Sequence, residues 1–135
     1  MEYTDENRGK IQHSNRIHQM VEFSGIRYGS ITPTDVDGFF EKADKAFVFF
    51  EFKMKGCEMP SGQRIALERV VNALRSAGKE AVLFECEHDT KPSENVKAAQ
   101  AIVRRVFWNG RWHKGKGLTV KAQTDKFMAF VGSLL

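Results

Sequence analysis

One run of residues, 46–54, constrains the fold of this 135-residue chain more than any other. Its sequence, AFVFFEFKM, is rich in aromatic and β-branched side chains, which favour a strand. Apolar residues occupy both alternation sets, so we expect a central strand that is covered on both faces. Glu51 and Lys53 fall on the same face as Phe47 and Phe49, which places two charges at the end of a core strand.

Patterns on either side of this run predict an α/β domain. A strand is expected over 36–41, joined to the central strand by the polar turn 42–45. A helix follows, capped by Ser61 and ended by Gly78, with apolar residues at helical spacing: Ala66, Val70, Ala73, Leu74 and Ala77. The next buried strand, 81–86, completes a strand-helix-strand unit, which implies some parallel pairing in a mixed sheet.

The two ends of the chain contain weaker patterns. The N-terminal side predicts a helix over about 8–23 and a short strand over 25–31. On the C-terminal side, a strand over 101–108 turns back through Asn109 and Gly110, a pair preferred in two-residue hairpins. Thr119 is expected to cap a last helix that packs inward through Val120, Phe127, Phe130, Val131 and Leu134.

Composition is typical of one folded domain over residues 1–135. Hydrophobic residues make up 41% of the chain and charged residues 28%, which excludes disordered and low-complexity classes. The longest apolar run, 46–50, is too short for a membrane span, so no membrane partner is expected. Cys57 and Cys86 form no CxxC pair, which predicts a reduced, cytoplasmic protein without a disulfide framework.

Positive charge is concentrated in one segment. Residues 95–124 contain seven Lys or Arg and no Asp or Glu, whereas the rest of the chain carries a net charge of −3. Cations interleaved with tryptophans are suited to phosphate contacts and base stacking, which predicts a nucleic-acid interface formed by Arg104, Arg105, Arg111, Trp112, Lys114 and Lys116. The alternative is that both tryptophans pack in the core and the cations are merely solvated.

The charges at the end of the central strand indicate a candidate reaction centre. A charge on a buried face is costly unless it is paired or binds a metal. Asp35 and Asp37 lie one hairpin upstream, where they can reach Glu51 laterally. Carboxylates from two neighbouring strands, with Lys53 alongside, would suit Mg²⁺ or Mn²⁺ and phosphodiester hydrolysis. The alternative is an ordinary salt bridge between Glu51 and Lys53 at the strand end.

Three short motifs follow one another in this part of the chain. They are the segment 34–38, the triplet 51–53, which begins fourteen residues after Asp37, and the segment 62–64 at a helix start. Together they resemble the PD-(D/E)XK nuclease superfamily, especially its small phage-type and Holliday-junction-resolvase-like members. The resemblance implies a restriction-endonuclease-like core, a mixed β-sheet flanked by helices. It also implies catalytic roles for Asp37, Glu51, Lys53 and Gln63, and metal binding by Asp37 (or Asp35) and Glu51. Glu22, in the predicted first helix, is a weaker candidate acid.

One departure from the family pattern concerns the first motif, where Thr34 replaces proline and Pro33 comes one place early. The register of the first aspartate therefore stays open between Asp35 and Asp37, and we favour Asp37 because Gly38 follows it. The expected activity is cleavage of double-stranded or branched DNA, as an endonuclease rather than an exonuclease, by a monomer or homodimer. The alternatives are a nucleic-acid-binding or host-interaction protein without catalysis, and a module that binds an acidic protein.

Overall fold

The computed structural model describes residues 21–134, and the chain divides into two compact units, Met1–Pro33 and Thr34–Leu135. In the first unit, residues 21–33 form turns and an isolated bridge between Tyr28 and Ile31, so the strand predicted over 25–31 is wrong. Most of the helix predicted over 8–23 lies outside the described residues, and residues 21–23 are not helical.

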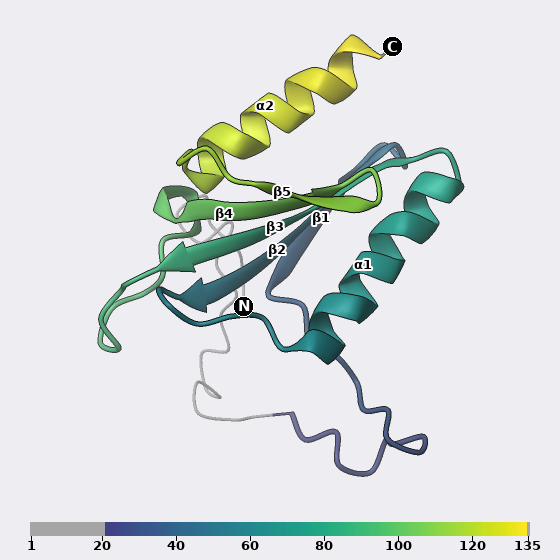
Figure 1. Ribbon diagram of the computed structural model, residues 1–135, viewed down its shortest axis with the longest axis vertical. Coiled ribbons are helices and arrows are strands. Elements are labelled where there is room, and N and C mark those ends of the chain that lie inside the picture. Colours follow the sequence, from purple (N-terminus) through teal and green to yellow (C-terminus); the bar gives the residue numbers. More distant parts are fainter. Residues whose placement is uncertain (1–20, 135) are drawn as a thin grey trace, which may run out of the picture. The chain divides into compact units, whose positions relative to one another are not determined.

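The second unit is an α/β structure built on a five-stranded mixed sheet, in the order β1-β2-β3-β4-β5 (Figure 1). β2 and β3 run parallel, and every other neighbouring pair is antiparallel. The strand-helix-strand prediction is confirmed, as are the mixed sheet and the nine-residue central strand. The strands are β1 (Gly38–Lys42), β2 (Ala46–Met54), β3 (Glu80–His88), β4 (Ile102–Trp108) and β5 (Arg111–Lys114).

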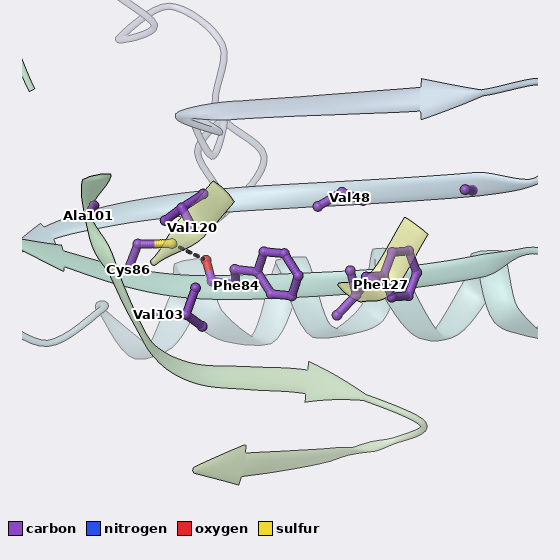
Figure 2. Close-up of a cluster of buried hydrophobic side chains, with 9 residues drawn as sticks. Val48, Phe84, Cys86, Ala101, Val103, Val120 and Phe127 are labelled. Carbon is purple, nitrogen blue, oxygen red and sulfur yellow. Dashed lines mark hydrogen bonds between the residues drawn. The ribbon is translucent and has the colours of Figure 1, made fainter. Parts of the chain in front are cut away.

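Two helices cover opposite faces of this sheet, α1 (Ser61–Ser76) and α2 (Val120–Ser133), and a short 3-10 helix, η1 (Ala98–Gln100), precedes β4. On the α2 face, Val48 and Phe84 pack with Phe127 (Figure 2). On the α1 face, Phe49 and Leu83 pack with Leu67 and Val71. β2 therefore contributes one alternation set to each core, as its sequence predicts.

The helices differ from prediction in the residues that they bury. α1 buries Leu67 and Val71, whereas Val70 is 42% exposed, so the predicted stripe is wrong at Val70. Leu74 packs against this core as predicted. Ser61 is the first helical residue, after Pro60, and its side chain makes no capping hydrogen bond. In α2, Thr119 is the cap, since its hydroxyl accepts a hydrogen bond from the N–H of Ala122 at 3.2 Å.

The C-terminal part of α2 is less buried than predicted. Val120 and Phe127 are buried, but Phe130 is 40% exposed and Leu134 is 57% exposed. Among the helices within residues 21–134, none is long and apolar enough to span a bilayer.

The β4–β5 hairpin turns at Asn109 and Gly110, which both have positive φ, as predicted. An irregularity in β4 follows from its pairing with β3. Glu85 is level with Arg105 and Cys86 with Val103, so Arg104 is an extra residue in a β-bulge. After β5, the chain passes against this bulge at Gly115, whose N–H donates to the Arg104 carbonyl at 2.8 Å.

Candidate active site

Asp37 and Glu51 interlock across the β1–β2 hairpin. The backbone N–H of Asp37 donates to Glu51 Oε1 at 3.0 Å, and the N–H of Phe52 donates to Asp37 Oδ2 at 2.7 Å. The hairpin register explains this contact, because Gly38 is paired with Phe50 and the preceding residue therefore comes level with Glu51. The structure thus brings together the two carboxylates that the sequence predicts for the site.

Glu51 is fully buried and incompletely satisfied. Its side chain has no exposed surface, and Oε2 has no hydrogen-bond partner within the described residues. Lys53 Nζ lies 3.5 Å from Oε2 and is itself 21% exposed, so it lies between the buried carboxylate and solvent. Burial raises the pKa of Glu51 and the charge of Asp37 raises it further, against the opposing effects of the Asp37 N–H and Lys53.

Asp35 and Gln63 form a second contact at the start of α1. Gln63 Nε2 donates to the Asp35 carbonyl at 3.2 Å and to Asp35 Oδ1 at 3.4 Å. Gln63 Oε1 is buried and has no partner within residues 21–134. The structure therefore associates Gln63 with Asp35 and Glu51 with Asp37.

The oxygen atoms of this hairpin fit a hard divalent cation. Glu51 Oε2 is a buried carboxylate oxygen without a hydrogen bond among the described residues, and the N–H of the next residue, Phe52, holds the carboxylate of Asp37 beside β2. No cluster of three or more His, Cys, Asp or Glu side chains able to hold a metal occurs among residues 21–134. Mg²⁺ is typically bound through one or two carboxylates, with waters and substrate phosphates completing its shell. Asp37 and Glu51 therefore provide as many carboxylate ligands as a protein typically supplies to Mg²⁺.

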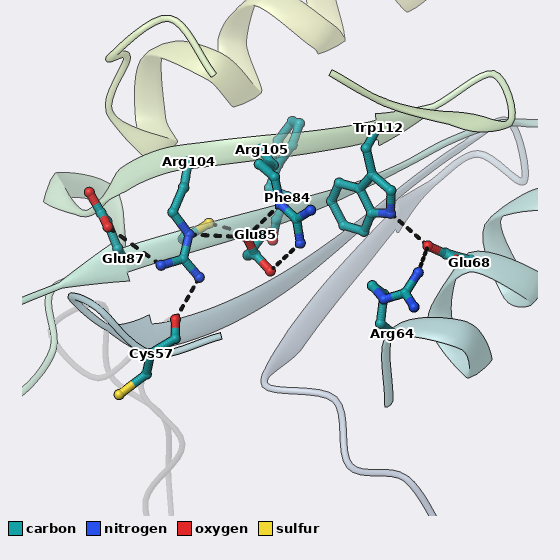
Figure 3. Close-up of polar contacts among 10 residues, drawn as sticks. Cys57, Arg64, Glu68, Phe84, Glu85, Glu87, Arg104, Arg105 and Trp112 are labelled. Atoms are coloured by element: carbon teal, nitrogen blue, oxygen red, sulfur yellow. Dashed lines mark hydrogen bonds and ion pairs between the residues drawn. The ribbon is translucent and has the colours of Figure 1, made fainter. Parts of the chain in front are cut away.

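A second buried carboxylate lies on the strand beside Glu51. Glu85 on β3 is level with Glu51 on β2, so both project from the α1 face of the sheet. Arg104 Nε lies 3.0 Å from Glu85 Oε1, and Arg105 donates to both Glu85 oxygens at 2.9 Å (Figure 3). The bulge at Arg104 explains how two consecutive arginines reach one carboxylate. Burial raises the pKa of Glu85, but these hydrogen bonds outweigh it and the pKa lies below its ordinary value.

The hydrogen-bonding groups of these arginines are largely used within the protein. Arg104 also donates to the Cys57 carbonyl at 2.7 Å and lies 3.6 Å from Glu87. The Arg105 guanidinium stacks over the Trp112 ring at 4.4 Å, and Trp112 Nε1 donates to Glu68 Oε2 at 2.6 Å. Figure 3 shows two groups of polar contacts on the α1 face, one around Glu85 and one around Glu68, and the stacking of Arg105 on Trp112 connects them.

The other predicted nucleic-acid contacts have a different environment. Arg111 and Lys114 are exposed on the edge strand β5, and Lys116 is exposed just beyond it. Trp112 is half-buried and packs at 5.3 Å against Phe107, so it belongs partly to the core. The basic segment therefore contains a partly exposed pair that binds Glu85, Arg104 and Arg105, and an exposed group after Asn109. Glu22 is exposed in the first unit and lies outside helical structure.

Glu85 is the residue of this region that our sequence reasoning missed. It stands within the apolar run 81–86, the same pattern that identified Glu51, so the signal was present. Its contacts with Arg104 and Arg105 depend on the bulge in β4, and no local sequence motif predicts that bulge.

Comparison of the chain with protein-family models, with curated proteins and with solved structures gives no match.

Proposed function

We propose that this protein is a metal-dependent DNA nuclease with a restriction-endonuclease-like core. The observation that carries the proposal is the buried Glu51 carboxylate, which is level with Asp37 and has one oxygen without a hydrogen bond beside Lys53. A structural salt bridge does not need a fully buried carboxylate next to a second acid. A cation between these carboxylates would offset both the burial and the repulsion.

Each residue of the hairpin has a role in this proposal. Asp37 and Glu51 would hold Mg²⁺ or Mn²⁺, which supplies Lewis-acid polarisation of a phosphoryl oxygen and lowers the pKa of a bound water. Lys53 would orient the attacking water and stabilise negative charge on the phosphate as the P–O bond breaks. Gln63 would keep the Asp35 segment against the start of α1, next to the hairpin.

Exposed cations after the β4–β5 turn supply the binding surface for a DNA backbone. Arg111, Lys114 and Lys116 are accessible, and none of them pairs with a carboxylate within residues 21–134. Such contacts are independent of base sequence and weaken steeply with salt. A homodimer would supply one site for each strand of a duplex.

Cleavage assays on plasmid, linear and branched DNA test the proposal. We expect products in Mg²⁺ or Mn²⁺, none in EDTA, and a loss of at least about 100-fold in rate for Glu51→Gln and Lys53→Met. The exposed residues Glu94 and Lys45 offer matched controls, Glu94→Gln and Lys45→Met, which should cleave at the wild-type rate. Cleavage that is unaffected by EDTA or by both site variants would contradict the proposal.

The main alternative is a nucleic-acid-binding protein without catalysis. The exposed cations of β5 favour it independently of the carboxylates. It would be supported by salt-sensitive DNA binding that needs no metal and survives Glu51→Gln, with no cleavage of any substrate.

A further inference from the structure

A pocket of about 420 Å³ lies between α2 and the sheet face that α2 covers. Phe84 and Val106 of the sheet and Phe127 of α2 supply apolar walls, and Trp108 and Phe130 are at its sides. Trp108 and Phe130 meet edge to face at 5.9 Å. The volume falls within the range of roughly 300–1,000 Å³ that is usual for small-ligand sites.

The charged residues of this pocket all have the same sign. Lys114, Lys116 and Lys126 line it, together with His113, and no Asp or Glu is among its lining residues. The three lysines are exposed, and none is paired with a carboxylate in the part of the chain that the structure describes. The pocket therefore complements an anion that also has an apolar body.

A neutral polar side chain narrows the choice of that body. Gln123 lines the pocket and offers both an amide donor and an amide acceptor. A hydrocarbon chain cannot hydrogen-bond to this amide, whereas a heteroaromatic ring with ring nitrogens and carbonyl oxygens can.

We propose that this pocket binds a nucleotide. Its base would lie against the aromatic side chains of Trp108 and Phe130 and hydrogen-bond to the Gln123 amide, and its phosphate would contact the lysines. The nucleotide could be free or could be an unpaired residue of a DNA strand, since both present the same chemistry. The proposal does not rest on nuclease activity, because Glu51 and Lys53 lie on the α1 face and the pocket lies on the α2 face.

The two tryptophans provide a built-in comparison for the test. In a ¹H–¹⁵N spectrum of the full chain, the Trp108 indole signal should shift progressively on titration with dAMP. The Trp112 indole signal should stay in place, because that N–H donates to Glu68 on the other face. Comparing titrations with dAMP and with the single strand dT₈ distinguishes a site for a free nucleotide from a site for a strand. Comparing dAMP with adenosine measures the contribution of the phosphate.

Substitutions on α2 locate the site. Phe130→Ala is expected to weaken binding roughly tenfold through loss of stacking, and Lys126→Ala roughly two- to fivefold. Lys121→Ala, on the same helix but outside the pocket lining, is the matched control and should bind like wild type. Glu51→Gln should also bind dAMP normally, so failure of the nuclease proposal and failure of this one are distinguishable.

Saturable binding of dAMP indicates a free-nucleotide site, and binding of dT₈ alone indicates a strand site. An unchanged Trp108 signal with both ligands would overturn the proposal. So would binding that Phe130→Ala and Lys126→Ala leave unchanged, or adenosine binding as tight as dAMP binding.

Discussion

The N–H of Asp37 donates to Glu51 Oε1 at 3.0 Å, while Asp37 Oδ2 accepts from the residue after Glu51 at 2.7 Å. These bonds hold two acids side by side and occupy one oxygen of each. Glu51 Oε2 is left without a hydrogen bond among the described residues. The hairpin therefore maintains a local excess of negative charge, which is costly for folding and useful for holding a cation.

Removing the charge of Glu51 should stabilise the metal-free protein. Burial gives Glu51 a folded-state pKa above its ordinary value of 4.5, so the unfolded chain loses that proton first as the pH rises. The folded state therefore loses stability as the pH rises above the unfolded pKa, until Glu51 also ionises in the folded protein. We expect the free energy of unfolding of Glu51→Gln, measured in urea at pH 7 with EDTA, to exceed that of the wild type by about 1 kcal/mol. This difference should shrink near pH 4. A less stable variant at pH 7 would contradict this account.

Glu85 should behave in the opposite way. Its folded-state pKa is lowered, so its contribution is complete above the unfolded value of 4.5 and disappears as the pH falls through the lower folded value. Glu85→Gln leaves Arg104 and Arg105 without their shared partner. It should lower the free energy of unfolding by about 2 kcal/mol at pH 7. The loss is no larger because both arginines are partly exposed to solvent. Urea unfolding between pH 3 and pH 7 measures the difference, which should narrow at the acid end; Glu94→Gln is the control.

Gly115 has no room for a side chain. A Cβ atom there would press on the Val103 carbonyl oxygen and lie 2.7 Å from that of Arg104, both of them backbone atoms of the bulge. Gly115→Ala should therefore lower the free energy of unfolding by about 1–3 kcal/mol. Gly132→Ala, on α2 with nothing within 4 Å, should be neutral or stabilising by up to about 1 kcal/mol. Equal stability of the two variants would show that β4 and the segment after β5 do not pack this closely.

The two cysteines should differ sharply in reactivity. Burial raises the pKa of the Cys86 thiol to about 12, with the charge of Glu85 adding to the effect, whereas Cys57 is exposed. Because the thiolate is the reactive form, a disulfide reagent at pH 8 should label Cys57 alone in the native protein and both thiols in urea. Rapid labelling of both cysteines without denaturant would contradict the burial of β3.

Local sequence patterns predict much of this fold. The alternation in β2, the turn at Asn109 and Gly110 and the cap at Thr119 each depend on residues within a few positions of one another. The proximity of Asp37 and Glu51 is predictable from the sequence for the same reason, because one short hairpin joins them.

Features that depend on distant partners were harder to predict. The buried stripe of α1 runs through Leu67 and Val71 rather than Val70, because the sheet beneath the helix determines which side it buries. The pairing of β4 with β3 creates the bulge at Arg104, which lets Arg104 and Arg105 both bind Glu85, a contact that the sequence does not predict.

Anomalous scattering from crystals grown with Mn²⁺, with and without a short DNA duplex, tests the central claim most directly. We predict a peak in contact with Glu51 Oε2 and the Asp37 carboxylate in the wild-type protein, and its loss in Glu51→Gln. Wild-type crystals that contain both Mn²⁺ and DNA but show no peak between these two carboxylates would contradict the claim.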